Sequence, residues 1–69
     1  MIDFSKPRFT ATYTNWRGET RERHLVAITL WYGSTNYHPE PQWLLRCMDL
    51  EKYEIRDMAL AGFTPPENP

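Results

Sequence analysis

Residues 8–18 read RFTATYTNWRG, a segment that predicts the first strand of the fold and the turn that follows it. From the second position on, aromatic or alanine residues alternate with threonines, which is the period-two pattern of a strand with one buried face. Residues 15–18 then carry turn-forming side chains, and the glycine at their end can adopt the positive φ that a tight turn needs. We therefore predict an antiparallel hairpin whose first strand is Arg8–Thr14.

The rest of the chain continues this pattern of short strands separated by turn residues. The second predicted strand, residues 19–32, is charged in its first half and nearly all apolar in its second. A loop with one glycine and two prolines follows at residues 33–41. We then expect a strand at Gln42–Asp49, a turn, a strand at residues 54–58, and a short fifth strand or a single helical turn at residues 59–63.

One alternative is a helix over residues 43–60, where several apolar residues loosely fit helical spacing. The polar interval at residues 49–53 lies between two apolar runs and favours strand–turn–strand instead. The predicted fold class is therefore all-β (mainly β), a small Sm-like or Src-homology-3-like barrel of four to five antiparallel strands. Closure into a barrel would protect the edges of so small a sheet. We expect Trp43, on the central strand, to pack in the core.

The composition fits one small domain. Of 69 residues, 41% are hydrophobic and 14% aromatic, which excludes an intrinsically disordered chain. We assign residues 1–7 to an N-terminal arm, residues 8–63 to the domain and residues 64–69 to a disordered tail. A single cysteine, Cys47, excludes an intramolecular disulfide. We expect a cytoplasmic protein, because no apolar run is long enough to span a membrane and residues 1–7 do not resemble a secretory signal.

Arginine is the residue type that most indicates function. The formal net charge is −1, so contact with an anion must come from a local patch rather than from an overall basic surface. Arg23, Arg46 and Arg56 alternate with apolar residues along their strands, and a charge on an apolar face is costly unless it is paired. Two interpretations stay open: an anion pocket at the mouth of the barrel, or structural ion pairs with nearby carboxylates.

Aromatic rings beside these cations suit single-stranded nucleic acid, because every base can stack on a ring. Trp16, on the predicted turn next to Arg17, is the ring that we most expect to be exposed, and Tyr13 is a second candidate for stacking. The same rings could instead fill the core of a small barrel. His24 and His38 are too few for a zinc site, and no nucleophile motif or phosphate-binding glycine loop is present. We therefore expect no metal, no cofactor and no enzyme activity.

Several segments occur in an order and at a spacing that resemble the WYL domain. They are Tyr13, the turn at Gly18, Arg23, WLL at residues 43–45 and RDMAL at residues 56–60. That family is named for a Trp-Tyr-Leu tripeptide on a central strand, which an Arg-x-Phe-x-Leu segment typically follows. Residues 37–46 also look like a stretch found in short stand-alone WYL-like proteins of bacterial or phage type.

The resemblance implies a small Sm-like barrel with a sensing or regulatory role, as in transcription regulation, and usually a nucleic-acid or nucleotide-like ligand. We therefore predict a stand-alone WYL-like module that binds nucleic acid or a nucleotide-like anion. The predicted ligand-binding residues are Tyr13, Trp16, Arg17, Arg23, Arg46 and Arg56. Lys52, on the predicted turn, is expected to contribute little. The alternative is a protein–protein interaction module, a homo-oligomer or a partner regulator, that uses the loop at residues 33–41 and an open strand edge.

Overall fold

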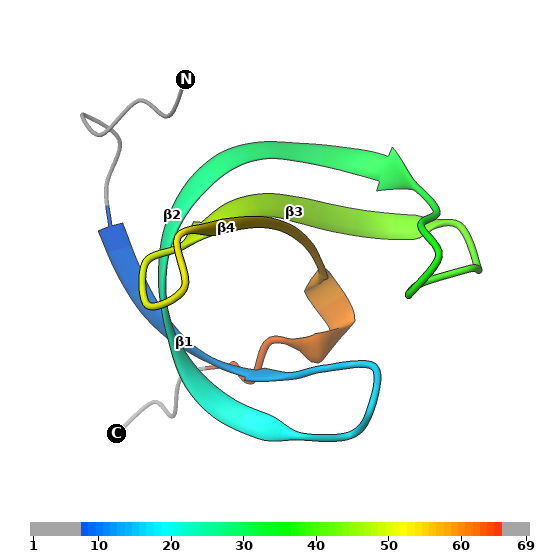
Figure 1. Ribbon diagram of the computed structural model, residues 1–69. Coiled ribbons are helices and arrows are strands. Elements are labelled where there is room, and N and C mark those ends of the chain that lie inside the picture. The colour runs from blue at the N-terminus through cyan, green and yellow to red at the C-terminus, as the bar shows by residue number, and fades with distance from the viewer. Residues whose placement is uncertain (1–7, 66–69) are drawn as a thin grey trace.

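The computed structural model describes residues 8–65, and this part of the chain is mainly β, which confirms the predicted fold class (Figure 1). One antiparallel sheet contains four strands in chain order. They are β1 (Arg8–Thr14), β2 (Thr20–Gly33), β3 (Gln42–Asp49) and β4 (Glu54–Ala59). A short 3₁₀ turn, η1 (Leu60–Gly62), follows β4, so the helical-turn alternative is confirmed there and the helix over residues 43–60 is wrong. The predicted arm and residues 66–69 of the predicted tail lie outside the described residues.

The first hairpin forms as its alternating sequence predicts. β1 pairs with the first half of β2, from Arg8 opposite Val26 to Thr14 opposite Thr20. The Asn15 side-chain oxygen accepts hydrogen bonds from the backbone amides of residues 17 and 19, both at 2.9 Å, and Gly18 has a φ of 82°. The tip of this hairpin is therefore held in one conformation by its own side chain.

The sheet curls strongly, because the long strand β2 bends partway along its length (Figure 1). The register between β2 and β3 shifts at a bulge between Ala27 and Thr29, and a bulge increases the local twist of a strand. The curl brings the chain after η1 back to β1, where Phe63 forms an isolated bridge with Tyr13 and the Thr64 amide donates to the Thr12 carbonyl at 2.9 Å. The sheet is not closed, so the predicted barrel is present only as this curled sheet.

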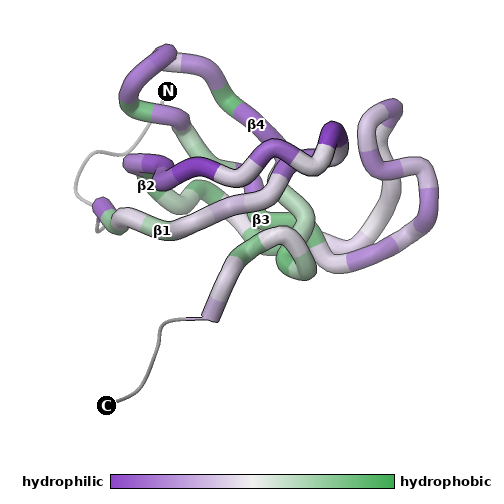
Figure 2. Tube along the Cα trace, turned by 90° about the horizontal axis from the view of Figure 1, so that it is seen from below, coloured by the Kyte–Doolittle hydropathy of each residue, from purple (hydrophilic) through white to green (hydrophobic). Residues whose placement is uncertain are grey.

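Buried hydrophobic side chains lie on both faces of the sheet, since Leu44 and Cys47 are both fully buried and strand alternation points them to opposite faces. The main cluster contains Tyr13, Leu25, Cys47 and Met58, one from each strand. The Tyr13 hydroxyl accepts a hydrogen bond from the Ala59 amide at 3.0 Å, so this ring joins β1 to β4. Figure 2 shows hydrophobic residues gathered along the middle of the sheet and hydrophilic residues toward the loops at its ends. Within residues 8–65, no helix is long and apolar enough to cross a membrane.

Trp43 does not pack in the core, so this prediction was wrong. Its side chain is 53% exposed, and its ring meets the edge of Tyr32 at a centroid distance of 5.5 Å. The reason is the length of the strands: β1 pairs with β2 only as far as Val26, and β4 pairs with β3 only from Leu44 onward. Trp43 therefore lies on a two-stranded extension of β2 and β3, where no third strand covers it.

We predict that Trp43→Ala and Leu44→Ala differ sharply in stability although the residues are neighbours. Trp43→Ala is expected to cost about 0.5–1.5 kcal/mol, the range for one aromatic pair. Leu44 is fully buried, and its truncation is expected to cost about 2–5 kcal/mol. Urea unfolding followed by circular dichroism measures both values. Equal losses for the two variants would contradict the placement of Trp43.

We also predict that the protein loses stability in alkaline solution. Burial, and secondarily the charge of Asp57, raises the pKa of the Cys47 thiol from 9.0 to about 12, and burial likewise raises the pKa of Tyr13. A pKa raised in the folded state stabilises the fold below the unfolded pKa, and this contribution is lost as the pH rises toward the folded pKa. The free energy of unfolding should therefore fall between pH 9 and 12. Cys47→Val should flatten part of this fall, and rapid alkylation of the native thiol at pH 8 would contradict the prediction.

Candidate functional site

An open pocket of about 670 Å³ lies on the concave side of the curled sheet. Its wall comes from the β1–β2 turn, from residues 35–38 of the β2–β3 loop, from Lys52 and from residues 54–58 of β4. The core residues Tyr13 and Met58 also line it, and because both are almost fully buried they form its floor. The volume is within the range of about 300–1,000 Å³ that small-molecule sites occupy.

A buried ion pair lies at the base of this pocket. Arg23, on β2, is 6% exposed, and its Nη1 donates to Oδ2 of Asp49 at 3.2 Å. Asp49 ends β3 and is 1% exposed. Its other oxygen, Oδ1, accepts from the backbone amides of Glu51 at 2.9 Å and Lys52 at 3.4 Å. Asp49 therefore connects Arg23 to the turn between β3 and β4.

The Arg23 guanidinium has unused donors. Its Nε is buried and has no hydrogen-bond partner, and Nη2 has none within residues 8–65. A buried donor without an acceptor costs about 1–3 kcal/mol, and such groups are rare in folded proteins. Nε itself is buried, so an acceptor that enters the pocket meets the part of the Arg23 side chain that lines it.

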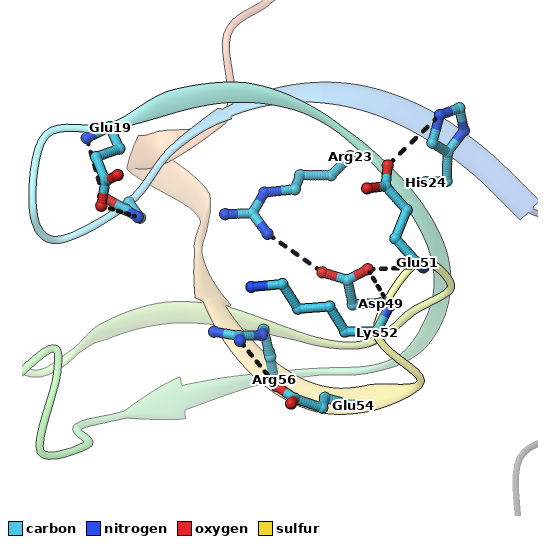
Figure 3. A network of polar contacts seen from close by, with 9 residues as sticks. Glu19, Arg23, His24, Asp49, Glu51, Lys52, Glu54 and Arg56 are labelled. Carbon is cyan, nitrogen blue, oxygen red and sulfur yellow. Dashed lines mark hydrogen bonds and ion pairs between the residues drawn. The ribbon is translucent and has the colours of Figure 1, made fainter.

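Two further cations point into the same space, as Figure 3 shows for Lys52 and Arg56 beside Arg23. The three side chains come from β2, from the β3–β4 turn and from β4. Arg56 Nη2 donates to Glu54 Oε2 at 2.8 Å, an exposed pair of the kind that contributes about 0–1 kcal/mol. The Lys52 ammonium has no acceptor in the described part of the chain. Lys52 therefore lines the pocket, although the sequence did not assign it to the ligand-binding residues.

Carboxylates also line the pocket, so its surface is mixed in charge. Glu19 and Glu54 line the pocket together with four cations, Arg17, Arg23, Lys52 and Arg56, whereas the Asp57 carboxylate binds Arg46. Arg23 and Arg56 already have a carboxylate each, whereas Arg17 and Lys52 have none within residues 8–65. The cations left for an anion are thus Lys52, Arg17 and the exposed Arg56, beside the buried Arg23.

An aromatic pair stands at the rim. The Trp16 ring, on the β1–β2 turn, lies 5.5 Å from the Tyr37 ring, on the β2–β3 loop. Both side chains are more than half exposed, which confirms the prediction for Trp16. The Arg17 guanidinium lies over the Trp16 ring at 5.0 Å. A flat ligand group can therefore meet a ring and a cation at the mouth of the pocket.

Arg46 does not reach the pocket, contrary to the sequence prediction. The register places Cys47 opposite Arg56 and Arg46 opposite Asp57, so the two arginines lie on opposite faces of the sheet. Arg46 Nε donates to Asp57 Oδ1 at 2.9 Å, and the guanidinium covers the Trp31 ring at 5.4 Å. The ion-pair interpretation is therefore the one that fits Arg46.

Tyr13 lines the pocket but does not offer a face for stacking. Its side chain is 4% exposed, and its ring packs against Phe63 at a centroid distance of 4.9 Å. The core-filling alternative accordingly describes Tyr13 better than the stacking role that the sequence suggested. Tyr37 is an exposed ring that the sequence did not single out, and its contact with Trp16 depends on the conformation of the eight-residue connection between β2 and β3.

Asp49 is the other residue that the sequence did not single out. The signal was present, because alternation along β3 places it on the same face as Leu45 and Cys47, where a carboxylate needs a buried partner. Among residues 8–65, no three histidine, cysteine or acidic side chains are placed to hold a metal ion together.

Comparison of the chain with protein-family models, with curated proteins and with solved structures gives no match. The resemblance to the WYL domain therefore stays a prediction, and the site is interpreted from its own geometry.

We predict that the Arg23–Asp49 pair is required for the fold. Arg23→Met leaves the Asp49 carboxylate buried without its cation, which is expected to cost about 3–5 kcal/mol. Adding Asp49→Asn to that variant removes the buried charge but keeps an oxygen for the turn amides, so part of the loss should return. Urea unfolding of the parent and both variants tests this. A loss below about 1 kcal/mol for Arg23→Met, typical of a surface position, would contradict it.

Proposed function

We propose that this protein is a small ligand-sensing or regulatory module that binds a nucleotide-like anion or nucleic acid in the pocket. The phosphate meets Arg23, Lys52 and Arg56, and the base meets Trp16 and Tyr37. The observation that supports this most is that the buried Arg23 lines an open pocket together with Lys52 and Arg56. As expected from the sequence, we propose that this module is WYL-like and related to small barrels. We also propose that it is cytoplasmic and has no enzyme activity.

Phosphate is the anion that these residues fit best. Arginine binds phosphate through two parallel hydrogen bonds, and charge-assisted bonds of this kind are about twice as strong as neutral ones. Lysine adds a point charge with three donors. Because the cations come from three elements, they approach a bound group from different directions (Figure 3). A tetrahedral group uses such an arrangement better than a planar carboxylate does.

The aromatic rim adds a reason to expect a base. Stacking of a base on an aromatic side chain contributes about 1–3 kcal/mol and tolerates any base. Trp16 and Tyr37 are exposed and line the same pocket as the buried Arg23 and the exposed Lys52 and Arg56. A nucleotide joins an anionic group and a flat ring at a short separation, which is the combination that this site offers.

We predict that Arg56→Ala weakens binding of a short single-stranded oligonucleotide by about 1.5–3 kcal/mol, the range for hydrogen bonds to charged groups. The melting temperature should change little, because the Arg56–Glu54 pair is exposed. Arg21→Ala is the matched control, since Arg21 is an exposed arginine outside the pocket.

Fluorescence titration at two salt concentrations measures these affinities, and parent binding should weaken steeply with salt. Failure of the parent to bind at low salt would refute the proposal. Equal losses of affinity in Arg56→Ala and Arg21→Ala would show a diffuse charge effect rather than a pocket.

A second candidate function is a protein–protein interaction module. The observation that favours it is the exposed apolar end of the β2–β3 extension, where Leu30, Tyr32 and Trp43 are all more than half exposed. Such side chains are typical of surfaces that associate with another protein. Analytical ultracentrifugation over a range of concentrations and salt separates the two functions, because apolar association persists at high salt whereas phosphate binding does not.

A further inference from the structure

We infer that the pocket selects a terminal phosphate, that is, a phosphate monoester on a nucleoside or at the end of a single strand, over an internal phosphodiester. This inference rests on the proposed function and narrows its ligand. It depends on the depth of Arg23, on the arrangement of the three cations and on the position of the aromatic rim.

The depth of the donors favours a chain end. Arg23 is 6% exposed and lies next to Tyr13 and Met58, which are 4% and 3% exposed. A phosphate must therefore approach the floor of the pocket to meet this guanidinium. An internal phosphodiester carries a strand on both sides, and that strand would have to descend to the floor and leave again. A terminal phosphate reaches the floor while the attached nucleoside stays at the mouth.

The number of donors favours a monoester as well. A phosphate monoester carries a charge of about −1.5 to −2 at pH 7 and three free oxygens, whereas a diester has a single charge and two. Three cationic side chains from β2, the β3–β4 turn and β4 converge in the pocket (Figure 3). Lys52 is unpaired, Arg23 has free N–H groups, and Glu54 is exposed enough to leave Arg56 to a bound phosphate.

The aromatic pair Trp16 and Tyr37 offers a stacking surface for the base of the nucleoside that carries the phosphate. Trp16 and Tyr37 line the same pocket as Arg23 but lie at its exposed end. With the phosphate at the floor, a base attached to the same nucleoside is directed outward to these rings. Arg23 is thus the buried cation of the pocket, whereas Lys52, Arg56 and the two rings are exposed around it.

The test uses thymidine hexanucleotides with a 5′-phosphate, with a 3′-phosphate or with neither, together with thymidine, thymidine 5′-monophosphate and inorganic phosphate. Isothermal titration at pH 7.5 and low salt should show at least about tenfold tighter binding of a phosphorylated end than of the same strand without it, which corresponds to one hydrogen bond to a charged group. The preference should shrink at pH 5, where the monoester loses its second charge because its second pKa is near 6.

Variants connect this preference to the pocket. Lys52→Met should reduce the preference to less than about threefold, because it removes a pocket cation that has no ion pair within residues 8–65, whereas Arg21→Met should leave it unchanged. Lys52 is exposed on a turn, and thermal melts show that each variant is folded before it is titrated.

The outcomes separate this inference from the proposed function. Equal binding of phosphorylated and unphosphorylated hexanucleotides overturns the terminal-phosphate inference and leaves nucleic-acid binding standing. No binding of any probe overturns both. Tight binding of thymidine 5′-monophosphate alone supports the inference with a free nucleotide as the source. A preference confined to the phosphorylated hexanucleotides supports it with a strand end as the source.

Discussion

The buried ion pair between Arg23 and Asp49 constrains most of this structure. It connects the first half of β2 to the end of β3, and through the second oxygen of Asp49 it fixes the turn that leads into β4. A small sheet has little apolar area with which to offset two buried charges, so neither residue can be lost without the other. The same pair holds a cation at the base of the pocket, because an arginine without Asp49 would turn toward solvent. Fold and candidate site thus share one interaction.

Arg46 and Arg23 both alternate with apolar residues in the sequence, but their hydrogen bonding in the structure differs. Arg46 binds Asp57 through two nitrogens and covers the Trp31 ring, and the Trp31 indole nitrogen donates to the same carboxylate. That cluster is satisfied by its own members. Arg23 has one hydrogen bond and a buried Nε without a partner. The contrast is the physical ground for placing the ligand at Arg23 and not at Arg46.

The sequence predicted the strands well, because alternation is a local property. β1 and β3 have the predicted bounds, and the turn at residues 15–18 forms as its asparagine and glycine indicate. The site was predicted only in part. Each strand shows its own parity, but whether Arg46 and Arg56 share a face depends on the register between strands, which no local pattern contains. The prediction that Trp43 is buried was wrong for a related reason. Alternation indicates which face of the sheet a side chain is on, but not whether a neighbouring strand extends far enough to cover it. Lys52 lies on a turn, so strand alternation does not predict where its side chain points.

The bulge in β2 divides the molecule into a part that must stay constant and a part that is free to vary. On one side lie the core and the Arg23–Asp49 pair, and beyond the bulge the β2–β3 extension carries a loop whose residues 35–38 border the pocket. Changes of length or sequence in that loop would alter which flat group is accepted without disturbing the phosphate contacts or the packing beneath them. Related chains could therefore diverge in ligand through one loop, and a designer could use the same loop to change specificity on an unchanged scaffold.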